Sequence, residues 1–71
     1  MNNTIFFRGI SKHGKNRIEQ NGMIWTIINQ GQGKDLPFTN EDGLWWLLKS
    51  ELTGFHRWFK VSGDKHFEMV Q

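Results

Sequence analysis

The sequence predicts a small β-rich domain, all-β or α+β, with a single antiparallel and strongly curved sheet of four or five strands and one short helix near residues 11–21. Several short segments rich in β-branched and aromatic residues are bounded by Gly, Asn and Asp, as strands are. Residues 11–22 carry helix start and stop signals, whereas a turn capped at Thr39 would end almost at once at Gly43. The chain of 71 residues is short enough for one domain, 1–71, and six Phe and four Trp provide large side chains for its core.

The first strand is expected at residues 4–8 (TIFFR), and the helix follows it. Ser11 is a good N-cap, and Gly22 after an Asn is a common C-terminal signal. Against the helix, Gly14 would lie in its interior at a cost of about 1 kcal/mol. The Asn-Gly pair is also a hairpin-turn dipeptide, which would make residues 15–20 a strand instead. We favour the helix and keep the strand as the alternative.

A second strand is expected at residues 23–29 (MIWTIIN), where neither face is polar. Residues 30–43 (QGQGKDLPFTNEDG) follow as a long loop that contains Pro37, the only proline. Long loops in small domains tend to be functional or mobile. We expect Phe38 to anchor this loop to the core.

Two further strands, at residues 44–48 and 55–61, flank a four-residue loop ending in Gly54, where a positive φ is expected. This loop places Trp46 opposite Phe59. The face with this pair is expected to be the core face, since burial of each large side chain contributes about 1.5–3 kcal/mol. Its members are Leu44, Trp46, Leu48, Ser50, Phe55, Arg57, Phe59 and Val61.

The opposite face of this hairpin, called the outer face below, mixes aromatic and basic residues. Its members are Trp45, Leu47, Lys49, His56, Trp58 and Lys60. One interpretation is structural: a second layer covers the Trp rings and the Lys side chains extend outward. The other is functional: the face is an exposed aromatic and basic surface.

A last strand at residues 65–70 is expected to follow a tight turn at residues 62–64. A three-residue loop places Phe67 opposite Phe59 on the core face. A slip of one residue would place Phe67 beside Lys60 and Trp58 on the outer face. The sequence does not choose between the two registers.

Charge is modest in sum but uneven along the chain. Nine Lys and Arg against seven Asp and Glu give a net charge of +2, a weak indication of polyanion binding. The segment from Arg8 to Arg17 has several cations and no acid. It is either a phosphate-contacting arm or a solvated face. Its basic residues are Arg8, Lys12, His13, Lys15 and Arg17.

No signature of catalysis or cofactor binding is present, so we expect neither an enzyme nor a cofactor. The chain has no Cys, and the three histidines, His13, His56 and His66, do not have a recognised metal-ligand spacing. A Ser-His pair from Ser11, Ser50 or Ser62 is unsupported by any motif. The sequence shows no secretory signal and no long apolar run, so we expect a cytoplasmic protein without a membrane partner.

Residues 23–70, with short strands, a long early loop and a late hairpin followed by one more strand, resemble small SH3-like barrels. This resemblance implies the barrel fold but transfers no function. In its Asn-rich, aromatic composition the chain is also similar to small accessory proteins of phages and mobile elements.

The aromatic and basic residues predict a non-catalytic module that binds nucleic acid, single-stranded or through its backbone, because exposed Trp beside Lys or Arg suits bases and phosphates. The alternative is a protein-binding adaptor or small inhibitor, for example phage-encoded and directed at a host protein, or a homodimer using the same face. The expected binding residues are Trp45, Lys49, His56, Trp58 and Lys60, helped by Arg8, Lys12, Lys15 and Arg17. The partner is nucleic acid or one protein, and the module is a monomer or a homodimer.

Overall fold

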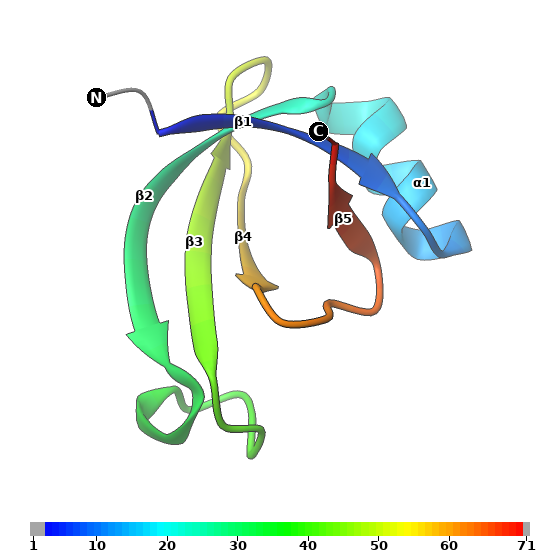
Figure 1. The fold of residues 1–71 in the computed structure, drawn as a ribbon. Coiled ribbons are helices and arrows are strands. Elements are labelled where there is room, and N and C mark those ends of the chain that lie inside the picture. Colours follow the sequence, from blue (N-terminus) through cyan, green and yellow to red (C-terminus); the bar gives the residue numbers. More distant parts are fainter. Residues whose placement is uncertain (1–2, 71) are drawn as a thin grey trace.

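In the computed structural model, which describes residues 3–70, five strands form one antiparallel sheet and a helix lies beside it (Figure 1). The strand order is β4-β3-β2-β1-β5. The predicted β-rich fold with one helix is confirmed. The elements are β1 (Thr4–Gly9), α1 (Lys12–Asn21), β2 (Ile24–Gln32), a 3-10 helix η1 (Gly33–Asp35), β3 (Leu44–Ser50), β4 (His56–Lys60) and β5 (Phe67–Met69).

The expected SH3-like barrel is not confirmed, because the sheet is neither closed nor strongly curled. The two end strands, β4 and β5, pair with β3 and β1 and not with each other. In Figure 1, β2 runs downward and β3 runs upward beside it, while β1 crosses above them. Within residues 3–70 the structure has no helix long and apolar enough to cross a membrane.

Helix α1 forms as the capping signals predict. The Ser11 hydroxyl accepts a hydrogen bond from the Gly14 N–H at 3.0 Å, and the N–H of Gly22, at φ 83°, donates to the Ile18 carbonyl at 2.7 Å. Close packing explains why a glycine occupies position 14, since a Cβ there would collide with the carbonyl of His66. The glycine that weakens the helix is therefore what lets it lie against the chain before β5.

The β3–β4 hairpin has the predicted register. Trp46 lies opposite Phe59, and Gly54 has a φ of 77°. One face of this hairpin packs into the core, where rings meet edge to face at 4.9 Å (Phe7 and Phe59) and 5.4 Å (Trp25 and Phe67). The buried core cluster consists of Phe7, Trp25, Leu48, Phe59 and Phe67.

A buried polar network ties the end of α1 to the β3–β4 turn. Ser50, placed on the core face by its sequence position, is buried and donates its hydroxyl to the Asn21 carbonyl. The Thr53 hydroxyl donates to Asn21 Oδ1 at 2.6 Å, and Asn21 Nδ2 donates to the Arg17 carbonyl at 3.0 Å. These bonds satisfy the polar groups of the buried side chains Asn21 and Ser50.

Both registers expected for the last strand are wrong, because β5 pairs with β1 instead of β4. Asp64 supplies the reason: its carboxylate accepts the backbone N–H groups of Lys60, His66 and Phe67 at 3.0, 2.9 and 3.1 Å. These bonds hold residues 61–66 in an irregular turn that leads away from β4. Phe67 still enters the core, as its apolar character requires.

Strand β2 continues past the predicted end at Asn29, and residues 30–32 of the expected loop belong to it. The continuation is possible because β2 has a bulge at Ile28, which separates the pair Ile27 and Leu48 from the pair Asn29 and Leu47.

Candidate functional site

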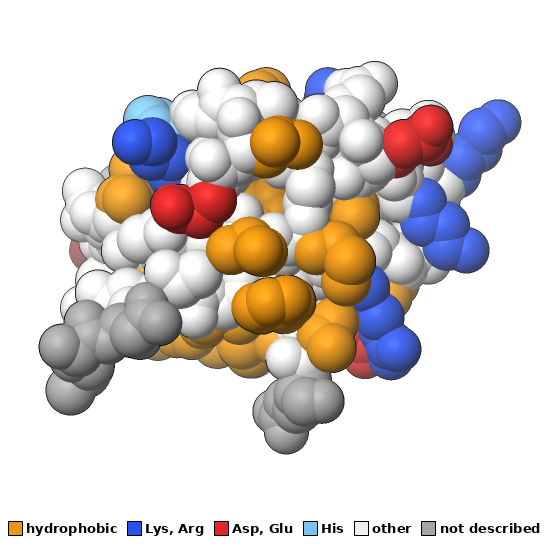
Figure 2. Space-filling model, turned by 90° about the horizontal axis from the view of Figure 1, so that it is seen from above, with side chains coloured by type: hydrophobic (Ala, Val, Ile, Leu, Met, Phe, Trp, Pro, Cys, Tyr) orange, Lys and Arg blue, Asp and Glu red, His pale blue; other side chains and the backbone are white. Residues whose placement is uncertain are grey.

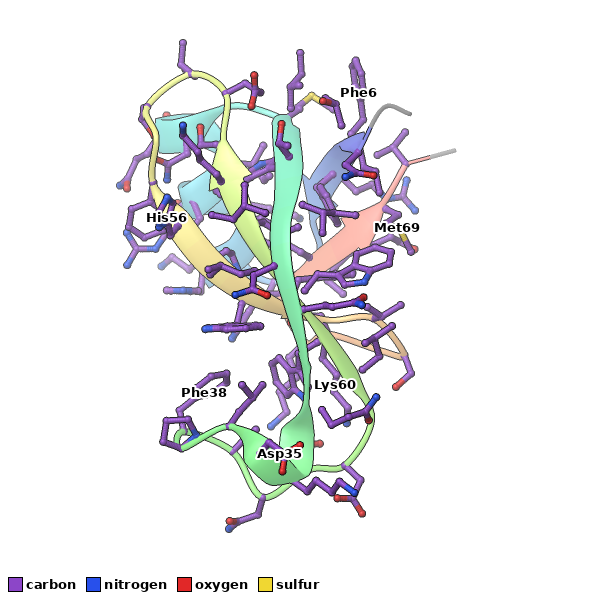
Figure 3. All side chains as sticks on the ribbon, turned by 90° about the vertical axis from the view of Figure 1, so that its left-hand side faces the viewer. Phe6, Asp35, Phe38, His56, Lys60 and Met69 are labelled. Atoms are coloured by element: carbon purple, nitrogen blue, oxygen red, sulfur yellow. The ribbon has the colours of Figure 1, made fainter. Side chains whose placement is uncertain are left out.

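An open cleft of about 500 Å³ lies between α1, β4, residues 38–41 and the turn at residues 61–66. In Figure 3, Phe38 on the long loop lies below β4, on the same side of the molecule as His56. Aromatic rings and charged groups share the walls. The cleft is lined by His13, Arg17, Phe38, Thr39, Glu41, Trp45, Phe55, Arg57, Trp58, Lys60, Gly63, Asp64, Lys65 and His66.

Phe38 anchors the long loop, but to the outer face of the sheet and not to the core as expected. Its ring meets Trp45 edge to face at 5.4 Å and lies tilted against Trp58 at 5.9 Å. Trp45 is only 8% exposed beneath it, whereas Phe38 itself is 52% exposed. The structural interpretation of the outer face therefore holds for Trp45, while Trp58 stays partly open to solvent.

Two glycines let the loop lie so close to the sheet. A Cβ at Gly31 would come within 3.2 Å of the Leu36 side chain, and one at Gly33 would collide with the carbonyl of Glu41. The N–H of Gly33 donates to the Gly43 carbonyl at 2.8 Å, which closes the loop on itself. The aromatic wall of the cleft depends on this closure.

The opposite wall is basic and comes from α1. His13 and Arg17 lie four residues apart, so they share one helix face. The His13 ring lies tilted against His66 with centroids 4.7 Å apart, and the Arg17 guanidinium lies 5.3 Å from the Phe55 ring centroid. His66 is fixed through Nδ1, which lies 2.6 Å from the Ser11 hydroxyl.

Two of the four Lys and Arg side chains of the cleft are paired with acids. Lys60 Nζ lies 2.8 Å from Glu41, and Arg57 lies 3.4 Å from Asp64. Within residues 3–70, Arg17 and Lys65 have no carboxylate within ion-pair distance. The cleft therefore carries more positive than negative charge.

Basic groups act on His13 at the helix side of the cleft. Loss of hydration, followed by the charges of His66, Arg17 and Arg57, lowers the pKa of the His13 imidazole from its usual 6.5. On the loop side, the hydrogen bond from Lys60 lowers the pKa of Glu41. The helix side of the cleft is thus the side that an anion would favour.

The structure brings four of the predicted binding residues together in this cleft: Arg17, Trp45, Trp58 and Lys60. The other five lie outside its lining. Lys49 and His56 pair across β3 and β4 nearer the turn, and Arg8 forms an ion pair with Glu68 at 2.7 Å. Lys12 and Lys15 are exposed on other parts of α1.

Sequence reasoning missed several lining residues. The spacing of His13 and Arg17 in a correctly predicted helix was a usable signal. Arg57 was assigned to the core face, where it indeed lies with its guanidinium 4.2 Å from the Phe67 ring centroid, yet it also reaches the cleft. No sequence pattern indicated that Lys65 and His66 would line the cleft, because their placement follows from the unexpected path of residues 61–66.

The cleft shows no arrangement typical of a metal site or a nucleophile. Within residues 3–70, no group of three or more His, Asp or Glu residues is placed to hold a metal ion. Ser11 and His66 form a serine-histidine pair, but the same hydroxyl accepts the Gly14 N–H as the helix cap. That engagement is a structural role.

A second surface feature lies on another side of the molecule. Figure 2 shows hydrophobic side chains gathered on the face seen from above. Phe6 and Ile24 are paired across β1 and β2, the Val70 N–H donates to the Phe6 carbonyl, and Leu52 lies 3.5 Å from where a Gly22 Cβ would be. We call Phe6, Met23, Ile24, Leu52 and Val70 the apolar patch; all five are exposed.

Comparison with known proteins gives no relative: no protein family matches the sequence, and no curated protein or solved structure matches the chain. The cleft and the apolar patch are therefore the features on which a function can be proposed.

Proposed function

We propose that the protein is a non-catalytic module that binds single-stranded nucleic acid through the cleft. The observation that carries this proposal is the meeting of partly exposed aromatic rings, Phe38 and Trp58, with the unpaired cations Arg17 and Lys65 in one hollow. Unpaired bases stack on aromatic rings, and cations beside them contact phosphates. A duplex offers these rings much less surface for stacking, because its bases are already stacked on one another.

The expected affinity follows from these two contributions. Stacking contributes about 1–3 kcal/mol per base, and each neutralised phosphate of a single strand adds a slope of about −0.7 to log K against log salt. Few phosphates can be contacted in so small a cleft. Binding should therefore be moderate at low salt and should weaken as salt rises.

The test is a tryptophan fluorescence titration with a mixed single-stranded oligonucleotide at low and at high salt. We expect quenching that weakens with salt, and we expect Arg17→Gln to weaken it about tenfold, or about 1.4 kcal/mol. Lys15→Gln is the matched control, since it removes one cation from the same helix outside the cleft. Equal losses in both variants, or no quenching at either salt concentration, would refute the proposal.

A second candidate is a protein-binding adaptor or small inhibitor, and the apolar patch favours it. Contiguous exposed apolar side chains are typical of protein contacts. Sedimentation at increasing protein concentration tests the homodimer form of this candidate. Leu52→Ser should abolish any increase in mass if the patch is the contact, because Leu52 is 73% exposed and contributes little to the fold. A cytoplasmic location and an accessory role of the phage type stay predictions.

A further inference from the structure

We infer that the cleft holds one nucleotide unit of the strand in a fixed direction, with its phosphate between His13 and Arg17 and its base against Phe38 and Trp58. This inference rests on the proposed function and adds the place and direction of the ligand. It follows from the chemical difference between the two ends of the cleft, from the position of the carboxylates, and from the size of the hollow.

The helix end is suited to a phosphate. The His66 ring lies tilted against His13 with centroids 4.7 Å apart, and Arg17 follows one turn later on the same helix face. Besides loss of hydration, the charges of His66, Arg17 and Arg57 lower the pKa of His13. Among residues 3–70, Arg17 makes one long side-chain hydrogen bond, 3.4 Å to Gln20, so its other N–H groups are available. The Arg17 guanidinium is a strong donor to phosphate oxygens, and a bound phosphate would favour the protonated His13 imidazole, which donates to it as well.

The loop end is suited to a base and not to a second phosphate. Phe38 and Trp58 present partly exposed rings there. Glu41 is exposed at the same end, and its carboxylate already holds Lys60 at 2.8 Å. A phosphate placed at this end would meet that carboxylate and would have to compete with it for the Lys60 ammonium group.

The second carboxylate of the cleft does not oppose a phosphate at the helix end. The Asp64 side chain is only 5% exposed and binds three backbone N–H groups besides Arg57. Arg57 also donates from Nε to the Trp58 carbonyl at 3.2 Å, which ties the basic end directly to the aromatic end. The two ends are thus held by consecutive residues of β4.

The size of the hollow limits the ligand. A volume of about 500 Å³ lies within the range of about 300–1,000 Å³ that is typical of pockets for one small ligand. One nucleotide unit fits this range, whereas several consecutive nucleotides do not. The neighbouring nucleotides of a longer strand would lie outside the cleft.

The experiment compares thymidine, thymidine 5′-monophosphate and an eight-residue oligothymidylate by NMR, following the His13 imidazole and the indole N–H of Trp58. We expect the monophosphate to perturb both signals and to raise the pKa of His13, because an anion would offset the charges of His66, Arg17 and Arg57. Thymidine should bind about tenfold more weakly, or by about 1.4 kcal/mol, and leave the His13 pKa unchanged. Arg17→Gln should remove the difference between the two ligands, whereas the control Lys15→Gln should keep it.

The outcomes separate this inference from the proposed function. If the oligothymidylate binds but the monophosphate leaves His13 unchanged, the assigned placement is wrong and the proposed function stands. If the monophosphate shifts His13 and Trp58 but the oligothymidylate does not bind, the placement is right and single-strand binding is refuted. If neither ligand binds, both fail.

Discussion

The two sides of the sheet hold their tryptophans differently. Trp25, on the core side, is fully buried, packs edge to face on Phe67, and donates its indole N–H to the Gly22 carbonyl at 3.0 Å. Trp45, on the outer side, is also buried, but Phe38 of the long loop covers it, and its indole N–H has no hydrogen-bond partner among the described residues. The buried indole N–H on the core side thus has a hydrogen-bond partner, and the one on the outer side does not.

The difference shows which side of the sheet contributes more to stability. A buried donor without a partner costs about 1–3 kcal/mol of folding free energy. The Trp45 indole N–H therefore lowers the stability of the protein, whereas the Trp25 indole N–H does not. The cover over Trp45 is a loop with an exposed Phe at its tip, not a strand or helix. The cleft beside it therefore has one wall formed by a helix, α1, and one wall formed by this loop.

The largest expected effect comes from exchanging each indole for a phenyl ring. Trp25→Phe should lower the free energy of unfolding by about 2–4 kcal/mol, because it leaves a cavity in the core and an unpaired Gly22 carbonyl. Trp45→Phe should cost less than about 1 kcal/mol, since removal of the unpaired N–H offsets the lost packing. Urea unfolding followed by circular dichroism measures both. An equal cost for the two variants would contradict the comparison.

The next effect concerns the helix wall of the cleft, α1. Gly14→Ala should destabilise the protein by about 1–3 kcal/mol, because the new Cβ collides with the His66 carbonyl and must push α1 away from the chain before β5. For a domain of this size, each kcal/mol lost from the free energy of unfolding should lower the melting temperature by about 4–8 °C. Lys15→Ala, on an exposed position of the same helix, is the matched control and should change the melting temperature little. A neutral Gly14→Ala would show that the helix does not need this close approach.

A smaller effect on stability is expected from the loop wall. Phe38→Ala should cost about 1 kcal/mol or less, because the ring is half exposed. It should nevertheless shift tryptophan emission to the red, since Trp45 would lose its cover. Leu52→Ala, at another exposed apolar side chain, is the control and should leave the emission unchanged. Unchanged emission in Phe38→Ala would mean that Trp45 is buried by other contacts.

Local signals predicted the parts of this fold whose partners are close in sequence. The turn ending in Gly54 determined which residues of β3 and β4 face each other, and Ser11 and Gly22 marked the ends of α1. The partner of β5 could not be found in the same way. Its position depends on the Asp64 carboxylate and on close contact with Gly14, and such interactions between distant segments leave no periodic pattern.

The same limit applies to the cleft. Trp58 and Lys60 were found because strand alternation places them on one face. His13 and His66 are 53 positions apart, and only the observed packing of α1 on residues 61–66 brings their rings together. The loop that covers Trp45 was predicted as a loop. The side of the sheet on which Phe38 packs was not predicted correctly, since one Phe in a loop can pack on either side.

The smallest expected effect is a dependence of stability on pH that originates at the helix wall. The pKa of His13 is lower in the folded protein than its ordinary value of 6.5, so the unfolded chain binds a proton more readily. The folded state should therefore lose stability as pH falls from about 7.5 through 6.5, and the loss should end below the folded pKa. Melting temperatures between pH 5.5 and 7.5 test this, a range that stays above the titration of Glu41 and Glu68, whose pKa values are also lowered.

His13→Gln should remove this part of the pH dependence, and Lys12→Gln, next to it and outside the cleft, should not. A bound phosphate should have the opposite influence, because it stabilises the protonated imidazole. The increase in melting temperature caused by thymidine 5′-monophosphate should favour pH 5.5 over pH 7.5 more strongly in the unmodified protein than in His13→Gln, which controls for the proton lost by the phosphate itself at about pH 6. The same pH profile for His13→Gln and the unmodified protein would show that the crowded charges of the helix wall do not act on this residue.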